Sequence, residues 1–219
     1  MPTVLLTGAN RGIGLALVRG FLARSHTVIA VCRRSSPELD ALGVRVLDGV
    51  DVTDDASISN LPDRLSGTRI DVLVNNASIL VRESLDRLDP AGWRRQMEVN
   101  AFGPLAITAA LLPLLAPAAK VVVITSRMGS IGDNGSGGYH GYRMSKAAVN
   151  AAFVSLARDL APRGIAVGIY HPGMVATEMT GRHGITPEQA AVGLIARIDA
   201  LDAGTSGRFL HQDGTELPW

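Results

Sequence analysis

The chain has 219 residues, of which 47% are hydrophobic, 19% charged and only 4% aromatic, and its formal net charge is +1. These values describe one globular domain with an aliphatic core and exclude a disordered chain. So small a net charge gives no field that would recruit nucleic acid or an anionic membrane surface. The only cysteine, Cys32, excludes an internal disulfide and fits a reducing compartment.

The ends and apolar stretches of the chain carry no targeting or membrane signal. The first ten residues, MPTVLLTGAN, lack the basic segment and the apolar core of a signal peptide. The longest apolar stretch, residues 101–119, is interrupted by Gly103 and three prolines, so it falls short of the roughly 18 uninterrupted residues of a membrane span. We therefore expect a cytoplasmic protein in which this stretch is part of a buried helix.

Short β-branched runs alternate with longer helical patterns along the chain. Strands are expected at residues 4–7, 27–32, 44–47, 70–75, 121–126, 165–170 and 208–211, and helices near 12–24, 54–65, 89–116, 143–161 and 187–201. Most strand runs are apolar on both faces, which is typical of a parallel sheet covered by helices on both sides. The pattern predicts an α/β fold, a Rossmann-type doubly wound parallel sheet, in a single domain spanning residues 1–219.

The first expected strand leads directly into TGANRGIG at residues 7–14, where a helix begins. Gly8 permits a tight turn, Gly12 lets the backbone approach a pyrophosphate, and Gly14 allows the helix to pack closely on the strand. The helix N-terminus adds free N–H groups and the positive end of a dipole. A plain glycine turn is the alternative, but the strand–turn–helix context favours a dinucleotide-binding turn.

The second expected strand ends at VCRR, residues 31–34. An NAD-binding fold normally places an acid here to accept the ribose 2′-hydroxyl, whereas this chain has Cys32 followed by Arg33 and Arg34. A guanidinium suits the doubly charged 2′-phosphate of NADP, and Arg11 in the glycine turn could reach the same phosphate. The alternative is three solvated arginines, so a preference for NADP(H) over NAD(H) is a hypothesis.

Residues 142–146, YRMSK, place a phenol and an ammonium four positions apart, on one face of a helix. Such a pair alone is usually helix surface. A reductase that delivers hydride to a carbonyl must also protonate the oxygen, and a nearby cation lowers the pKa of a phenol from about 10. With Ser126 at the end of an expected strand, Tyr142 and Lys146 form a candidate proton-transfer centre.

Six motifs occur in order: TGxxxGxG, NNAS at 75–78, Asn100, TS at 125–126, YxxxK at 142–146 and HPG at 171–173. Together they resemble the short-chain dehydrogenase/reductase family over nearly the whole chain, most closely its small carbonyl-reductase-like group with C-factor-type and sniffer-type proteins. The resemblance implies NADP(H)-dependent reduction of an aldehyde, ketone or quinone to an alcohol. It also implies a catalytic set in which Tyr142 is the general acid, namely Asn100, Ser126, Tyr142 and Lys146.

The glycine turn and the resemblance together imply a set of cofactor-binding residues. Besides Tyr142 and Lys146, this set comprises Gly8, Asn10, Arg11, Gly12, Ile13, Gly14, Arg33, Asp51, Val52, Asn75, Asn76, Ala77, Pro172, Gly173, Val175 and Thr177. Within it, the resemblance assigns the adenine to the pair at 51–52 and the nicotinamide side to residues 172–177. No histidine has metal-ligand spacing to another ligand, so no metal is expected.

The sequence departs from the family pattern in two places. Ser78 stands where the family usually has glycine, a change that is expected to be tolerated. The glycine-rich run 129–138 lengthens the distance from Ser126 to Tyr142, which leaves Ser130 as a rival for the catalytic serine; Ser126 is favoured because it ends the apolar strand. The acids of residues 83–89 are interpreted as a solvated loop and helix start.

The segment that covers the substrate in the family is short here, residues 177–186 only, and predicts an open cleft for varied carbonyl or alcohol substrates. The resemblance implies a homodimer or homotetramer formed through the two long helices, and residues 147–157 are small enough for close helix approach. A dinucleotide-binding signalling or redox-sensing protein with little turnover is the alternative function. Retention of Tyr142 and Lys146 favours an enzyme.

Overall fold

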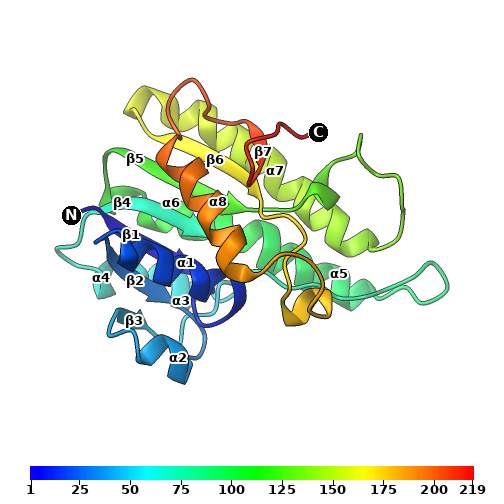
Figure 1. Cartoon of the computed structure of the whole chain (residues 1–219), viewed down its shortest axis with the longest axis horizontal. Helices are drawn as coiled ribbons and strands as arrows, with labels where there is room; N and C mark the ends of the chain where they lie inside the picture. The colour runs from blue at the N-terminus through cyan, green and yellow to red at the C-terminus, as the bar shows by residue number, and fades with distance from the viewer.

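The computed structural model describes all 219 residues, from Met1 to Trp219. Seven strands form one sheet in the order β3-β2-β1-β4-β5-β6-β7, and every pair of neighbours is parallel. The chain winds outward from β1 in one direction and, from β4 onward, in the other, with helices on both faces (Figure 1). The predicted Rossmann-type doubly wound sheet is confirmed.

All seven expected strands are present. They are β1 (Thr3–Thr7), β2 (Thr27–Val31), β3 (Arg45–Leu47), β4 (Ile70–Asn75), β5 (Leu115–Ile124), β6 (Ala166–His171) and β7 (Phe209–His211). Only β5 differs clearly, because it begins at Leu115 rather than near residue 121. Its register with β4 shifts between Ile70 and Val72, so the early part is irregular and contains a proline that disguises it in the sequence.

The helices differ more from expectation. They are α1 (Gly12–Ala23), α2 (Pro37–Asp40), α3 (Asp55–Ser59), α4 (Leu61–Arg64), α5 (Pro90–Met97), α6 (Gly103–Leu111), α7 (His140–Leu160) and α8 (Pro187–Asp199), with 3₁₀ turns at Leu112–Leu114, Arg127–Gly129, Ala161–Arg163 and Glu178–Thr180. The single helix expected over 54–65 is wrong: it divides at Asn60, where Pro62 starts a second helix. Short α2 was not expected.

A π-helical segment, Glu98–Phe102, joins α5 to α6, so helix continues from Pro90 to Leu114. The buried helix expected over this stretch is confirmed, and Gly103 and the proline after it lie within the helix, in the first turn of α6, where a proline is tolerated. By length and mean hydropathy, 1.4, the helix could cross a membrane. Its buried side chains, among them Ile107 and Leu111, instead belong to the core on one face of the sheet.

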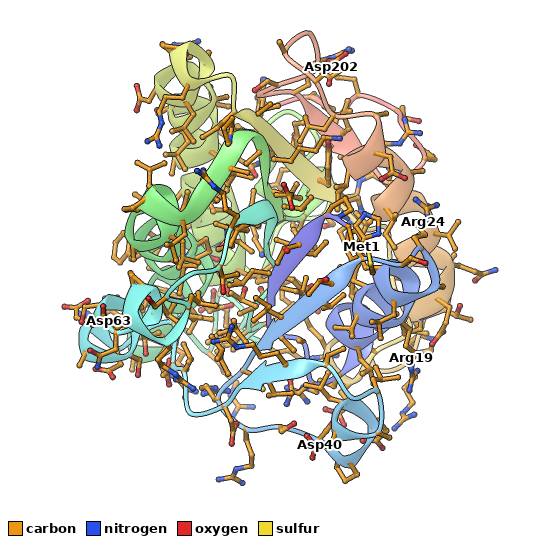
Figure 2. All side chains as sticks on the ribbon, turned by 90° about the vertical axis from the view of Figure 1, so that its left-hand side faces the viewer. Met1, Arg19, Arg24, Asp40, Asp63 and Asp202 are labelled. Atoms are coloured by element: carbon orange, nitrogen blue, oxygen red, sulfur yellow. The ribbon has the colours of Figure 1, made fainter.

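Two hydrophobic cores lie on opposite faces of the sheet. The face toward the viewer in Figure 1 is covered by α1 and α8, whose Phe21 and Leu194 are fully buried. The other face is covered by α4, α6 and α7, and Phe153 of α7 is fully buried there. Charged side chains point outward at the periphery, such as Arg19, Arg24 and Asp63 in Figure 2. The strands are therefore buried on both faces, as their composition predicts.

The carboxyl ends of the parallel strands meet at one end of the sheet, where ligands bind in folds of this kind. Two long connections extend from that side, at the right of Figure 1. One is the β4–α5 connection and the other is the glycine-rich loop before α7. In that loop Gly137, Gly138 and Tyr139 all have positive φ. Glycine adopts this conformation readily, which explains the two glycines.

Candidate active site

The turn between β1 and α1 has the backbone that its glycines predict. Gly8 and Gly12 have φ values of 67° and 53°, and a Cβ on Gly14 would lie 2.0 Å from the carbonyl oxygen of Gly8. No side chain caps the N-terminus of α1, and its first turn carries no acid. Ile13 packs against the adjoining core. The turn thus presents free N–H groups around a space that stays open because its glycines carry no side chain. This arrangement fits a bound pyrophosphate.

Asn76, just after β4, holds this turn in place. Its Nδ2 donates to the carbonyl oxygens of Thr7 and Gly8 at 3.1 and 3.0 Å, while its backbone N–H and that of Ala77 donate to Thr7 Oγ1. Asn75 instead points into the fold, where its Nδ2 donates to Thr108 Oγ1 at 3.1 Å and ties β4 to α6. The NNA element therefore fixes the geometry of the glycine turn.

The far end of the crevice contains the expected arginine. Arg33 is exposed, and its Nη1 lies 3.8 Å from Asp51 Oδ2, a distance at which an exposed pair stabilises the fold very little. Asp51 is oriented by Thr53, whose N–H and hydroxyl donate to Oδ1. The Val52 carbonyl oxygen lies 2.7 Å from where a Cβ of Gly103 would be, so this segment is pressed against α6. The Arg33 guanidinium is available to an anion.

Arg11 lies in the glycine turn with an exposed side chain, and its role toward a 2′-phosphate stays a prediction. Its guanidinium forms an exposed ion pair with Glu178 in the segment after β6. The neighbouring Asn10 donates to the carbonyl oxygen of Arg34 at 3.0 Å and accepts at its own carbonyl from Ser36 Oγ at 2.8 Å. Sequence reasoning missed Ser36, which also caps α2 by accepting from Leu39 N–H. Ser36 thus links the glycine turn to the segment after β2 that carries Arg33 and Arg34.

Tyr142 and Lys146 lie on the buried face of α7, with 7% and 2% of their surface exposed. The Lys146 Nζ is 5.7 Å from the centroid of the Tyr142 ring and donates to the carbonyl oxygen of Ile124, at the end of β5, at 3.1 Å. Ser126 lies two residues after Ile124, and hydrogen bonding from Ser126 lowers the pKa of Tyr142. The phenol, the ammonium and the strand-end hydroxyl are therefore brought together.

Burial governs the protonation of this centre. It raises the pKa of Tyr142 to about 12, against hydrogen bonding from Ser126 and then Ser78, which lowers it. Burial also lowers the pKa of Lys146 to about 7, because only one acceptor faces its three N–H donors. The expectation that the lysine charge would lower the phenol pKa does not hold for the free protein. A buried lysine that is only partly charged near neutral pH exerts a weakened field.

Asn100, in the π-helical segment, is the centre of a buried network beside Tyr142. Its Nδ2 donates to the Ile79 carbonyl oxygen at 2.9 Å and to Ser145 Oγ at 3.0 Å. Its Oδ1 accepts from Ser78 Oγ at 3.0 Å and from Ile79 N–H at 2.8 Å. Ser145 in turn donates to the Tyr142 carbonyl oxygen at 2.8 Å. The amide is fully engaged, so the network is rigid.

The two candidate serines have different surroundings. Ser126 Oγ accepts from Met128 N–H at 3.1 Å, and hydrogen bonding from Ser126 lowers the pKa of Tyr142. Ser130 is also buried, but its hydroxyl accepts from Asp133 N–H at 2.9 Å and stabilises the start of the glycine-rich loop. The choice of Ser126 as the catalytic serine stays a prediction.

The segment after β6 closes the other side of the crevice. Gly173 has φ 84°, and Val175 forms a parallel bridge with Ile185. The Thr177 Cγ2 methyl lies 3.3 Å from where a Cβ of Gly12 would be, so the segment that begins at Pro172 meets the glycine turn. Arg82, from the β4–α5 connection, donates across to the Met179 carbonyl oxygen at 3.4 Å. The segment after β6 is therefore linked to the β4–α5 connection through the Arg82 guanidinium.

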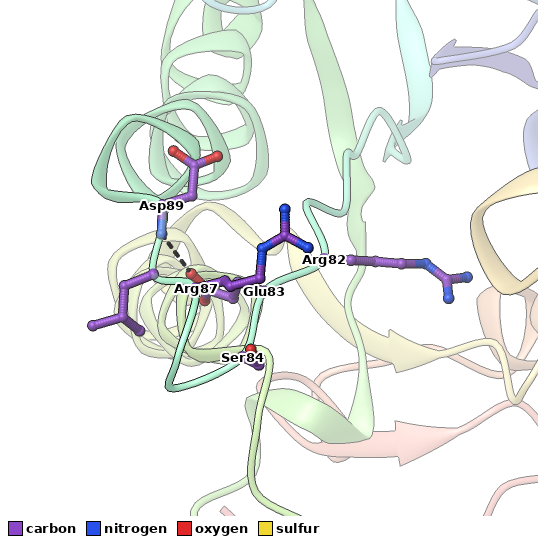
Figure 3. A pocket seen from close by; sticks show the side chains of 6 residues that line it. Arg82, Glu83, Ser84, Arg87 and Asp89 are labelled. Carbon is purple, nitrogen blue, oxygen red and sulfur yellow. Dashed lines mark hydrogen bonds between the residues drawn. The ribbon is translucent and has the colours of Figure 1, made fainter.

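The interpretation of residues 83–89 as solvated acids is wrong for Glu83. Its Oε1 accepts from Gly141 N–H, at the start of α7, at 2.5 Å, and Oε2 accepts from Trp93 Nε1. Figure 3 shows it within a hollow of the β4–α5 connection, while the Arg82 side chain points away toward the segment after β6. Asp89 does start α5, as its N-cap. Glu83 thus fixes the helix end that carries Tyr142.

Comparisons with known proteins agree with this geometry. The family profile described as short chain dehydrogenase matches residues 2–187. The 1-hydroxy-2-glutathionyl-2-methyl-3-butene dehydrogenase of Rhodococcus sp. (strain AD45) is 46% identical over 226 residues, covering 100% of both chains. The C-signal protein of Myxococcus xanthus is 44% identical over 68% of this chain and 93% of its own. The crystal structure of NADPH-bound carbonyl reductase from chicken fatty liver superposes with a TM-score of 0.90, at 29% identity, over 100% of this chain and 99% of that one.

Proposed function

The chain belongs to the short-chain dehydrogenase family of oxidoreductases, as its motifs indicate, and we propose that it is an NADP(H)-dependent carbonyl reductase. The observation that carries the proposal is the buried group of Tyr142, Lys146 and Ser126 at the carboxyl end of β5, on the same edge of the sheet as the uncapped N-terminus of α1. Its substrates are aldehydes, ketones or quinones, or the corresponding alcohols in the reverse direction.

The residues that would hold the dinucleotide follow from the geometry of the crevice. The N–H groups of the glycine turn would bind the pyrophosphate, and the Arg33 guanidinium would pair with the 2′-phosphate. Asp51 and Val52 would hold the adenine, Asn76 and Ala77 support the turn, and the segment from Pro172 to Thr177 would hold the nicotinamide. When bound, the nicotinamide supplies or accepts the hydride.

The proton chemistry belongs to the chain itself. Tyr142 gives its hydroxyl proton to the substrate oxygen as negative charge develops there, and Ser126 donates a hydrogen bond to the same oxygen. Burial lowers the pKa of Lys146 to about 7, and its ammonium stabilises the phenolate when it is charged. Asn100 keeps α7 and the β4–α5 connection in register.

The substitution Tyr142→Phe tests this proposal. It removes the proton donor without changing the ring, so turnover of a reactive aldehyde or diketone with NADPH should fall at least about a hundredfold. NADPH affinity, measured by the fluorescence of the bound cofactor, should stay unchanged. Tyr139→Phe, the same change three residues earlier, is the matched control and should retain full activity. Turnover that survives in Tyr142→Phe would contradict the assignment.

A second candidate, a dinucleotide-binding signalling protein with little turnover, draws on the similarity to the Myxococcus C-signal protein. The same assay separates the two, because a binder takes up NADPH without oxidising it in the presence of any carbonyl compound. The name of the Rhodococcus relative adds one substrate to test in the oxidative direction, an alcohol that carries a glutathionyl group.

We further propose that the protein is cytoplasmic and self-associates through α6 and α7. The free thiol of Cys32 is compatible with a reducing compartment. On α6 and the residue before it, Leu105 and Phe102 are 39% and 52% exposed, large apolar side chains that a second copy would cover. Light scattering should give the mass of a dimer or tetramer, and Phe102→Glu should shift it toward the monomer.

A further inference from the structure

The glycine-rich loop, residues 130–139, connects the two halves of the candidate proton-transfer centre. It begins shortly after Ser126 and leads into α7, which carries Tyr142, at the carboxyl edge of the sheet (Figure 1). The first limb of the loop is anchored outside it, because Gly132 N–H donates to the Trp219 carbonyl oxygen at 2.8 Å. This part of the loop is therefore tied to the segment after β7.

The returning limb, residues 134–138, has no such anchor in its own backbone. A Cβ added to Gly135, Gly137 or Gly138 would meet no heavy atom within 4 Å beyond the adjacent residues, so packing does not hold these positions. The Gly137 N–H donates to Asn134 Oδ1 at 3.1 Å, a bond that stays within the limb. Three glycines in a short stretch also give the limb a large conformational entropy to lose. The limb needs a partner outside itself to keep one conformation.

Arg143, in the first turn of α7, is that partner. Its Nε donates to the Gly138 carbonyl oxygen at 3.0 Å. Its Nη2 donates to Ser136 Oγ at 2.9 Å and to the Gly137 carbonyl oxygen at 3.2 Å. Its Nη1 reaches the Met128 carbonyl oxygen, at the base of the loop, at 3.5 Å. Because a guanidinium presents five N–H donors in a fixed plane, one side chain holds the returning limb to both ends of the loop.

We propose, on the basis of the proposed function, that Arg143 is a specificity-determining positioning residue, which holds the returning limb as a fixed wall of the substrate site. A small carbonyl compound bound at Ser126 and Tyr142 ends before this wall, whereas a bulky one extends to it. A preformed wall spares the bulky substrate the cost of ordering the limb.

The proton donor does not depend on this wall. The Tyr142 carbonyl oxygen accepts from Ser145 Oγ at 2.8 Å, and Ser145 Oγ accepts from Asn100 Nδ2 at 3.0 Å. These contacts fix the backbone of α7 at Tyr142 without the guanidinium. Loss of Arg143 should therefore weaken the binding of bulky substrates and leave the chemical step intact.

The experiment compares two variants with the wild type by two readouts. Arg143→Met removes every donor, and Arg143→Lys keeps the charge but lacks the planar fork. Arg158→Met, an exposed arginine of the same helix, is the matched control. One readout is amide hydrogen exchange of residues 130–139, measured by mass spectrometry, which requires no turnover. The other is KM and kcat with NADPH for diacetyl, a small diketone, and for benzil, a bulky one.

In Arg143→Met the loop should exchange at least about tenfold faster. The KM for benzil should rise about tenfold, while the KM for diacetyl and both kcat values stay within about twofold, because only binding energy shared by ground and transition states is lost. Arg143→Lys should recover part of both effects, and Arg158→Met should match the wild type.

Unchanged exchange in Arg143→Met would overturn the proposal that the guanidinium holds the loop. Faster exchange with both KM values raised equally, or with neither raised, would overturn its role in specificity. If the wild type reduces no carbonyl compound, the proposed function fails. The exchange rates then still decide whether Arg143 holds the loop, because they do not depend on turnover.

Discussion

The buried Lys146 ammonium should make the cofactor-free protein more stable as the pH rises above neutrality. Lys146 is 2% exposed, and its Nζ has a single acceptor, the Ile124 carbonyl oxygen. Burial therefore lowers its pKa from 10.5 to about 7. The unfolded chain binds a proton at this group over the whole range between these values, whereas the folded chain does not. Stability is lowest below the folded pKa and increases as the pH rises toward the unfolded pKa.

The magnitude follows from the two pKa values. Each pH unit within the range is worth about 1.4 kcal/mol, and the folded group is still half protonated at the lower limit. From pH 7 to pH 9 the free energy of unfolding should therefore rise by about 2 kcal/mol. Cys32 and Tyr142, whose pKa values are raised to about 11 and about 12, act in the opposite direction, but only above their unfolded values of 9.0 and 10.0.

Urea denaturation at several pH values between 7 and 9 measures this slope. Lys146→Met keeps the length and apolar volume of the side chain and removes its charge. The free energy of unfolding of the variant should therefore lack the rise of about 2 kcal/mol between pH 7 and pH 9. Lys120, whose pKa is also lowered by burial, contributes equally to both proteins. Equal slopes for wild type and variant would refute the reasoning that Lys146 loses its proton in the folded state.

Two further substitutions test the ends of the site. Arg33→Asp replaces the exposed cation beside Asp51 with an acid, so the ratio of kcat/KM for NADPH to that for NADH should fall at least about tenfold; equal use of both cofactors by the wild type would contradict the assignment. The Glu83 carboxylate accepts from Gly141 N–H and from Trp93 Nε1, and in Glu83→Gln the amide NH₂ group would face one of these two donors. The free energy of unfolding should therefore fall by about 2 kcal/mol. Asp86→Asn, exposed in the same connection, should leave stability unchanged.

The parts of the site that local spacing determines could be predicted from the sequence. The strand–turn–helix at residues 7–14 and the phenol–ammonium pair on α7 depend on contacts within a few positions, which periodicity and glycine placement report directly. Ser126 is favoured over Ser130 because it ends an apolar strand, and this choice stays a prediction. The alternation of strands and helices predicted the doubly wound parallel sheet, which the structure confirms.

The rest depends on contacts between residues far apart in the chain, for which one sequence holds no signal. Arg11 meets Glu178, and Glu83 meets the start of α7, only because the fold brings separate loops together. The direction of the Tyr142 pKa shift was misjudged for a related reason. Spacing gives the separation of Tyr142 and Lys146, but burial decides their protonation, and burial is a property of the packed protein.

The β4–α5 connection makes contacts with several separate parts of the candidate site. Within eight residues it holds the glycine turn through Asn76 and the Asn100 amide through Ser78. It then reaches the segment after β6 through Arg82 and the start of α7 through Glu83. The glycine turn, the start of the helix that carries Tyr142 and the segment after β6 are thus all tied to one stretch of backbone.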